Sequence, residues 1–445
     1  MPARACTHRP RAARQRGAAT LFTTIIVLVL MTMIAFFANR GVLFERKTSA
    51  NQYRSTKAIE AADAGLEWAL ANLNSFRRIT TGCATTTASG SRTFRDRYLD
   101  PDGDGSFGSR AGVSTPATME PFAATAVLCV RSGTGWSCSC PAEGTQPVAA
   151  ACTDPQGCPT FRVSFSSVRA DGNPANPQMD PTLVRVTAVG CTDARQPCVP
   201  GAADAADGTA EVNQVFKLAS ALATLPAAAI TAKGWVDFGS NAITATNTDP
   251  GTNGVTINAG LDITGFINDS TIDTLPGTPV GASLIGNDTS LATLSDDQMF
   301  RTFFGTSKEQ FRDSPSTTVV TCGGVCNTTL LDAIAGGART IWVEGDMTLN
   351  ANDVFGSLAR PVMLVVNGNI EVRGNMTFYG VLYSQDSTWD NTGGGNAQIF
   401  GAAISEGNFE ATGTPDPTYD PKVLQNLRQT TGQYAKVPGG WRDYR

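Results

Sequence analysis

Residues 18–38 form an apolar stretch without a single charged side chain. A helix of about 20 such residues is long enough to cross the hydrocarbon core of a membrane. The stretch follows a basic leader, residues 1–17, which contains five arginines and no acidic residue. Because basic residues stay on the cytoplasmic side, this pattern predicts a single-pass inner-membrane protein with a cytoplasmic N-terminus.

Small residues on the cytoplasmic side of this stretch indicate a cleavage site there. A secretory signal peptide carries its small residues after the apolar stretch, so cleavage removes the apolar segment. Here Gly17 ends the basic leader and Ala18 begins the apolar stretch. Cleavage between Gly17 and Ala18 would therefore leave the hydrophobic helix on the mature protein. The alternative is that residues 18–38 are a plain membrane anchor of a periplasmic protein.

This arrangement resembles the class III leader of type IV pilins, which prepilin peptidase removes. The block Ala58–Glu67 is similar to the helix of PilX-type minor pilins, so the chain resembles the PilX N-terminal family. One position departs from the major pilins: the fifth residue after the cut is Phe22, where they carry glutamate. PilX minor pilins and the K-type pseudopilin of type II secretion share this loss. A carboxylate in hydrocarbon is costly unless it is paired.

The resemblance implies an α+β fold, with a long N-terminal helix over residues 18–75 packed on an antiparallel sheet. It also implies N-methylation of Ala18 and a role in priming pilus assembly at the filament tip, on the cell surface. The implied partners are other minor pilins, the major pilin, the inner-membrane assembly platform, prepilin peptidase and, as a further candidate, a tip adhesin. Two alternatives stay open: a K-type pseudopilin, and a membrane-anchored periplasmic β-helix protein that acts as a binding protein or adhesin.

Two strand-rich regions are expected after the helix. Residues 76–220 begin with a loop-rich segment, and alternating apolar runs separated by Gly, Pro, Asp and Cys then predict antiparallel strands. In residues 221–445, short β segments recur roughly every 20 residues from Ile341 onward, close to one turn of a parallel β-helix. A β-sandwich is the alternative. Helices are predicted from Ser295 to about Phe311 and near residues 421–430.

Cysteine usage agrees with export. Cys6 lies in the leader, and ten of the 11 cysteines remain after it. An even number of cysteines in an exported chain indicates disulfide bonds. Cys191 with Cys198 and Cys322 with Cys326 are candidate pairs because each would close a short loop. The pairing of the other six cannot be assigned, and their spacing lacks the C-x-x-C pattern typical of zinc sites.

Charge and residue usage exclude several functions. Removal of the leader brings the formal charge from −5 to about −10, which argues against nucleic acid as the main partner. The single histidine, His8, lies in the leader, so a mature chain cannot use a Ser-His-Asp or Cys-His mechanism. Phosphate-binding and nucleophile motifs are absent from the sequence. We therefore expect no enzyme activity, no catalytic residues and no certain cofactor.

One motif could bind a metal ion. Asp100, Asp102 and Asp104 match the first half of a calcium loop, D-x-D-x-D-G. The twelfth position is Ala111, where a bidentate glutamate is expected, so calcium would need oxygens from elsewhere. The alternative is a solvated acidic turn.

Overall fold

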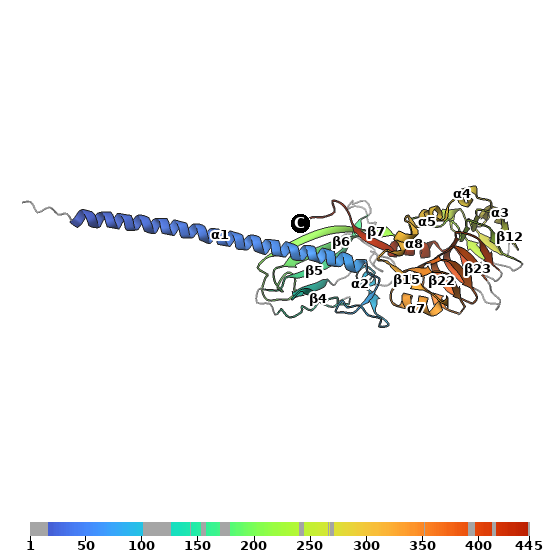
Figure 1. Cartoon of the computed structure of the whole chain (residues 1–445), viewed down its shortest axis with the longest axis horizontal. Helices are drawn as coiled ribbons and strands as arrows, with labels where there is room; N and C mark the ends of the chain where they lie inside the picture. The colour runs from blue at the N-terminus through green and yellow to red at the C-terminus, as the bar shows by residue number, and fades with distance from the viewer. Residues whose placement is uncertain are drawn as a thin grey trace, which may run out of the picture. The chain divides into compact units, whose positions relative to one another are not determined.

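The computed structural model describes most of the chain. The described residues are 17–100, 126–142, 144–152, 157–169, 179–239, 244–265, 267, 271–350, 352–389, 397–411 and 415–443. The chain divides into two compact units, Met1–Lys57 and Ala58–Arg445. Helix α1 (Gly17–Leu73) supplies the described part of the first unit and continues into the second, which holds the strands (Figure 1). The predicted long helix is confirmed, and it ends at Leu73 rather than at residue 75.

Small residues let the C-terminal part of α1 pack closely on an antiparallel sheet. Strand β6 (Met179–Cys191) of this sheet contains Gly190. A Cβ atom on Gly190 would lie 2.1 Å from the carbonyl oxygen of Ala58 and 2.4 Å from the amide nitrogen of Ala62. Both alanines are fully buried. The alanine-rich block noted in the sequence is thus the packing face of the helix, where larger side chains would push the two backbones apart.

The antiparallel sheet has six strands. In spatial order they are β27 (Gly432–Lys436), β7 (Thr209–Ser220), β6, β5 (Thr160–Arg169), β3 (Val127–Ser132) and β4 (Gly135–Ser139). All neighbouring pairs are antiparallel, so the predicted α+β arrangement is confirmed. The expected boundary at residue 221 differs from the structure in one respect. Strand β27 comes from the end of the chain and pairs with β7.

A short hairpin and a short helix connect α1 to this sheet. Strand β1 (Arg78–Ile79) pairs with β2 (Arg92–Thr93), and helix α2 (Phe94–Tyr98) follows at once. The side chain of Thr93 caps α2 by accepting a 3.1 Å hydrogen bond from the amide of Asp96. These elements occupy the described part of the segment that the sequence predicts to be loop-rich.

Parallel strands stack on one another in the second half of the chain. In strands β17 (Thr340–Glu344) and β20 (Val362–Asn367), Glu344 lies beside Asn367, 23 residues later. After each of these strands a tight turn leads to a strand of a second sheet, β18 (Met347–Leu349) or β21 (Asn369–Val372). The pairs described within this stack are parallel, whereas β-sandwiches are built from antiparallel sheets. The pairing therefore favours the β-helix prediction over the sandwich alternative.

The stack has three faces. In spatial order, the first consists of β15 (Thr317–Thr321), β17, β20, β22 (Thr377–Ser384), β24 (Gln398–Ser405), β8 (Ile230–Ala232), β11 (Ile257–Ala259) and β14 (Leu284–Ile285). The second consists of β16 (Gly324–Val325), β18, β21, β23 (Asp386–Trp389), β25 (Phe409–Ala411), β9 (Val236–Asp237) and β12 (Ile263–Thr264). The third includes β19 (Val354–Phe355), β26 (Asp416–Thr418), β10 (Ala245–Asn247) and β13 (Ile272–Thr274), joined by the first residues of β22 and β24.

The spatial order of the coils differs from their order in the sequence. The chain enters the stack at β8, in the middle, and runs to one end at β14. It continues through helices α4 (Thr289–Ala292), α5 (Asp296–Phe304) and α6 (Lys308–Arg312) to the other end of the stack, at β15. From β15 the coils return toward the middle, and β24 closes the stack on β8 by pairing Ala403 with Ile230.

The strands of the first face pack on both of their sides. In β17, Ile341 and Val343 belong to the interior core of the stack, whereas Trp342 belongs to an outer cluster. Helices α5, α6 and α8 (Pro421–Thr430) cover this outer cluster with apolar side chains such as Phe300 and Leu424. The ring centroids of Phe300 and Tyr383 of β22 lie 5.3 Å apart. A sheet packed on both sides explains why its strands read as continuous apolar runs.

The expected helix from Ser295 to about Phe311 is wrong as a single element. Ser295 caps α5 as predicted, but Gly305 adopts a left-handed conformation (φ 68°) and ends this helix. Ser307 then caps α6 with a second capping box. The predicted helix near residues 421–430 is confirmed as α8.

Candidate assembly site

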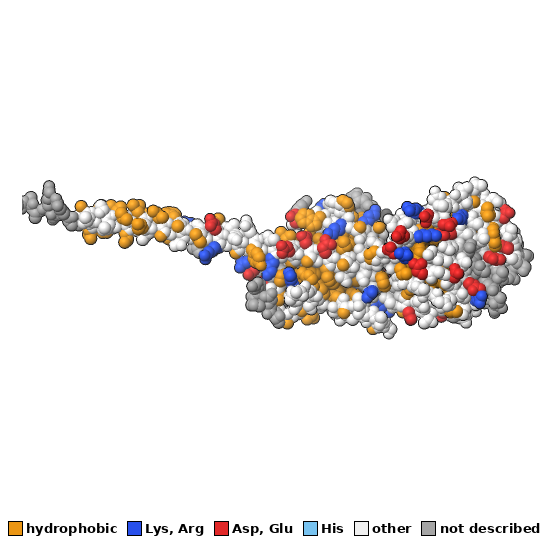
Figure 2. All heavy atoms as spheres, in the orientation of Figure 1, with side chains coloured by type: hydrophobic (Ala, Val, Ile, Leu, Met, Phe, Trp, Pro, Cys, Tyr) orange, Lys and Arg blue, Asp and Glu red, His pale blue; other side chains and the backbone are white. Residues whose placement is uncertain are grey.

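The N-terminal part of α1 exposes a long apolar surface. Among the described residues, α1 is the one helix long and apolar enough to cross a membrane. Its most apolar window has a mean hydropathy of 2.6 and buries nothing within the chain. Phe22, for example, is 68% exposed, and Figure 2 shows hydrophobic side chains gathered along this helix. A surface of this kind requires lipid or other helices as its surroundings.

The residues predicted to flank the cleavage site lie at the start of this helix. Gly17 is the first residue of α1, and Ala18 is the second. The rest of the leader lies outside the described residues. Phe22 lies one turn further along, inside the uncharged stretch. Cleavage between Gly17 and Ala18 and methylation of Ala18 stay predictions.

Arg95 of α2 holds together the end of α1 and the end of the chain. Its guanidinium donates hydrogen bonds to the backbone carbonyls of Leu73, Thr430 (3.1 Å) and Gly432 (2.7 Å). Leu73 and Thr430 are the last residues of α1 and α8, so the cation lies where the partial negative ends of two helices meet. Burial lowers the pKa of Arg95. The guanidinium carbon also lies 5.0 Å from the ring centroid of Tyr434.

Asp96, next to Arg95, ties α2 to the stack of parallel strands. Its carboxylate lies 3.3 Å from Arg339 and 3.8 Å from Arg360. The residue is buried (6% exposed). Burial raises the pKa of the Asp96 carboxyl, but Arg339 and Arg360 outweigh this effect and hold the pKa below its ordinary value. Arg95 and Asp96 together link α1, the antiparallel sheet and the parallel stack. Neither residue was predicted from the sequence to have a role.

The ten cysteines of the described residues are paired in five disulfides. The pairs are Cys83–Cys140, Cys129–Cys138, Cys152–Cys158, Cys191–Cys198 and Cys322–Cys326. They include the two local pairs proposed from spacing, and they leave no free cysteine among these ten as a zinc ligand. Disulfides of this kind suit an exported protein.

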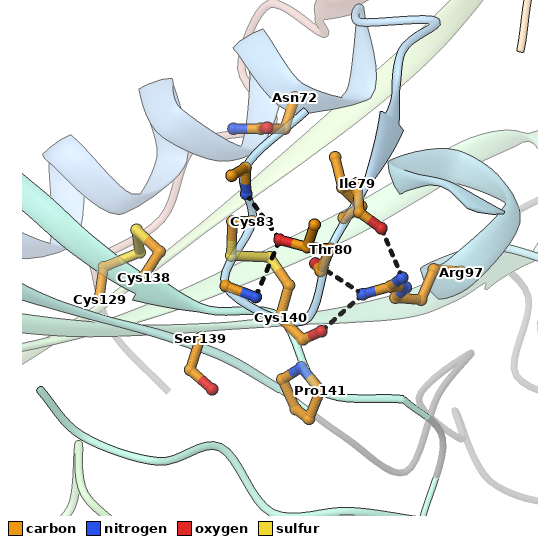
Figure 3. Close-up of a disulfide and its surroundings, with 12 residues drawn as sticks. Asn72, Ile79, Thr80, Cys83, Arg97, Cys129, Cys138, Ser139, Cys140 and Pro141 are labelled. Atoms are coloured by element: carbon orange, nitrogen blue, oxygen red, sulfur yellow. Dashed lines mark hydrogen bonds between the residues drawn. A yellow bond between two sulfur atoms is a disulfide. The ribbon is translucent and has the colours of Figure 1, made fainter. Parts of the chain in front are cut away.

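Figure 3 shows how the Cys83–Cys140 disulfide joins the segment after α1 to the edge of the sheet. Arg97 lies beside it and donates to the carbonyls of Ile79 (2.8 Å), Thr80 (3.0 Å) and Cys140 (2.7 Å). The disulfide and the arginine thus fix the β1–α2 region, from which Arg95 and Asp96 reach their partners.

The calcium motif falls mostly outside the described residues. Asp100 is described and is buried (1% exposed), whereas Asp102 and Asp104 are not described. The described residues contain no cluster of three or more acidic, histidine or cysteine side chains suited to a metal ion. Calcium binding therefore stays a prediction.

The N-terminal helix exposes its apolar part and packs its later turns on an antiparallel sheet, an arrangement similar to that of type IV pilins. Residues 16–67 match the PilX N-terminal family. Among solved structures, the competence-associated pilin ComZ from Thermus thermophilus aligns with 87% of this chain and 97% of its own, at 14% identity and a TM-score of 0.21. No curated protein matches this chain.

Proposed function

We propose that this chain is a PilX-like minor pilin that primes assembly of a type IV pilus and sits at the filament tip. The observation that carries the proposal is the match over residues 16–67 to a pilin family, on a helix whose apolar surface is exposed. The helix first anchors the protein in the inner membrane, with its N-terminus in the cytoplasm. It then exchanges lipid for the helices of neighbouring pilins, because both surroundings are apolar.

Phe22 supports the position at the tip. A carboxylate at this place would need a positive partner, since an unpaired charge in an apolar environment is costly. A subunit at the tip has no neighbour above it to provide that partner. An apolar side chain avoids the cost, and the large head of parallel coils suits a subunit that occurs once rather than in a repeat.

The partners follow from this position. We infer contacts with other minor pilins, the major pilin, the assembly platform and prepilin peptidase, and a tip adhesin is a further candidate. The chain carries no histidine after its leader, and we propose a structural role rather than an enzymatic one.

The test begins with processing. The protein is produced with and without prepilin peptidase. Its N-terminal residues are identified by sequencing, and its mass is measured by mass spectrometry. We expect a methylated Ala18 only when the peptidase is present. An uncut chain, or a cut after residue 38, would overturn the proposal. A Gly17→Glu variant should block processing and keep the protein out of sheared pili, and a Gly41→Ala variant, at an open position of the same helix, is the control.

A second experiment locates the subunit. Antibody–gold labelling of sheared pili should mark filament ends, and deletion should reduce surface pili. Label along the whole shaft would contradict a tip position. Phe22 equally suits a K-type pseudopilin, and loss of type II secretion with normal piliation would favour that function. Normal piliation and normal secretion together would favour an anchored periplasmic binding protein or adhesin.

A further inference from the structure

The two ends of the parallel stack are built differently. At the β15–β16 end, helix α7 (Asn327–Ala335) covers the interior core, and its Leu330 is buried (1% exposed). Phe76, which follows α1, also packs on this core. This end is therefore covered by the protein itself, as stacks of repeats require at their termini.

At the opposite end, the described residues leave the core open. There Ile263, Val280 and Leu284 pack against the interior core but are only partly buried. Leu261 (47%) and Ile285 (39%) are exposed beside them. Helix α3 (Val280–Ser283), whose first residue packs on this core, is a single turn. Among the residues that the structure describes, the last apolar layer thus has no counterpart of α7.

Strand edges are also open at this end. Strands β12, β13 and β14 are the last of the three faces, and each pairs with one neighbour among the described strands. An unpaired edge presents a row of backbone donors and acceptors that can pair with an added strand. Successive side chains of a strand point to opposite faces of the sheet. Every second residue of an added strand would therefore lie over the apolar layer.

Charge selects among the partners that could cover this end. Residues 234–300, which contain strands β9 to β14 and the first half of α5, include eight aspartates and no lysine, arginine or histidine. One of these aspartates, Asp296, is paired with Lys233, the residue just before the segment. Asp262 and Asp273 are exposed at the open end itself. A second copy stacked end to end would bring aspartates against aspartates, and an anionic membrane would be repelled in the same way. A partner with lysine or arginine would be attracted.

We propose that the β12–β14 end of the stack is a docking surface for an extended segment of another protein, with apolar residues alternating with lysine or arginine. The segment adds a parallel strand to the open edges, its apolar side chains complete the core layer above Leu284, and its basic side chains face Asp262 and Asp273. This surface does not depend on the filament role, because it belongs to the head alone.

The test uses the full-length protein in detergent and a synthetic peptide of about ten residues that alternates valine and lysine. We expect binding by fluorescence anisotropy, with an affinity at least tenfold weaker for the Ile285→Lys and Asp273→Lys variants. Matched controls are Val354→Lys and Asp332→Lys, which alter an exposed valine (58%) of β19 and an exposed aspartate of α7, away from this end. Thermal melting of each variant checks that the head stays folded.

Three outcomes would overturn the proposal. One is absence of binding by the valine–lysine peptide. Another is equal binding by a valine–glutamate or a serine–lysine peptide, because each lacks one of the two features invoked. The third is a concentration-dependent dimer that Ile285→Lys abolishes, which would identify a second copy as the occupant.

Discussion

Arg95 donates a 2.7 Å hydrogen bond to the backbone carbonyl of Gly432, a residue 337 positions later in the chain. The same guanidinium also bonds to the carbonyls of Leu73 and Thr430, so it links the last turn of α1 to the end of α8 and the start of β27. A load applied to the helix would therefore reach the head through Arg95 as well as through the covalent chain.

The Arg95→Ala variant should lose about 3 kcal/mol of unfolding free energy, because three buried carbonyls lose a charged donor. Urea titration of the full-length protein measures this loss. The control is Arg77→Ala, since Arg77 is exposed nearby. Equal stability of the two variants would show that Arg95 is not a structural link.

Gly190→Val should separate α1 from the sheet. The added Cβ would lie 2.1 Å from the carbonyl oxygen of Ala58, and overpacking of this kind typically costs about 1–3 kcal/mol or more. Limited proteolysis should then cleave within the last turns of α1. Gly135→Ala in β4 meets open space and should leave the digestion pattern unchanged.

Asp96 should make the stability of the head depend on pH in acid. Its pKa is lower in the folded protein than the ordinary value of 3.8, so the ionised form favours folding. This contribution is fully present above about pH 4 and is lost as the pH falls through the folded pKa. Asp96→Asn should cost about 3 kcal/mol at pH 7, the low end for loss of one partner of a buried ion pair, and its difference from the wild type should shrink near pH 3. A difference that persists unchanged at pH 3 would contradict this account.

The buried contact of Glu406 should hold α6 against the stack. Glu406 (3% exposed) accepts 2.6 Å and 2.7 Å hydrogen bonds from Tyr383 and Lys308. Glu406→Gln removes the charge that Lys308 faces and should cost about 2 kcal/mol, whereas Tyr383→Phe removes one neutral donor and should cost about 1 kcal/mol. Thermal denaturation compares the two. A larger loss in Tyr383→Phe would mean that the ion pair contributes little.

Local patterns in the sequence predicted the elements that depend on neighbouring residues. The apolar stretch, four of the six strands of the antiparallel sheet and the helix near residues 421–430 follow from periodicity and capping over a few residues. The prediction of a single helix after Ser295 was wrong because Gly305 ends α5 in a left-handed conformation. Glycine is found both inside and at the ends of helices, so its identity alone did not predict this end.

Long-range relationships could not be predicted in this way. Arg95 and Asp96 lie in a short helix without apolar periodicity, and two of their partners, Gly432 and Arg339, are 337 and 243 residues away. The disulfide between Cys83 and Cys140 joins residues 57 positions apart. Their spacing in the sequence therefore did not favour this pair over the other possible pairs. Strand β27 was not predicted, and it joins the antiparallel sheet by pairing with β7, more than 200 residues earlier in the chain.

The pairing of β24 with β8 sets the order in which the head can mature. Trp235, just after β8, bonds to Asn408, 173 residues later. The coils from β8 to β14 come early in this half of the chain, yet β24, the strand that completes them, begins at Gln398. A product truncated before residue 398 would therefore leave one flank of β8 unpaired.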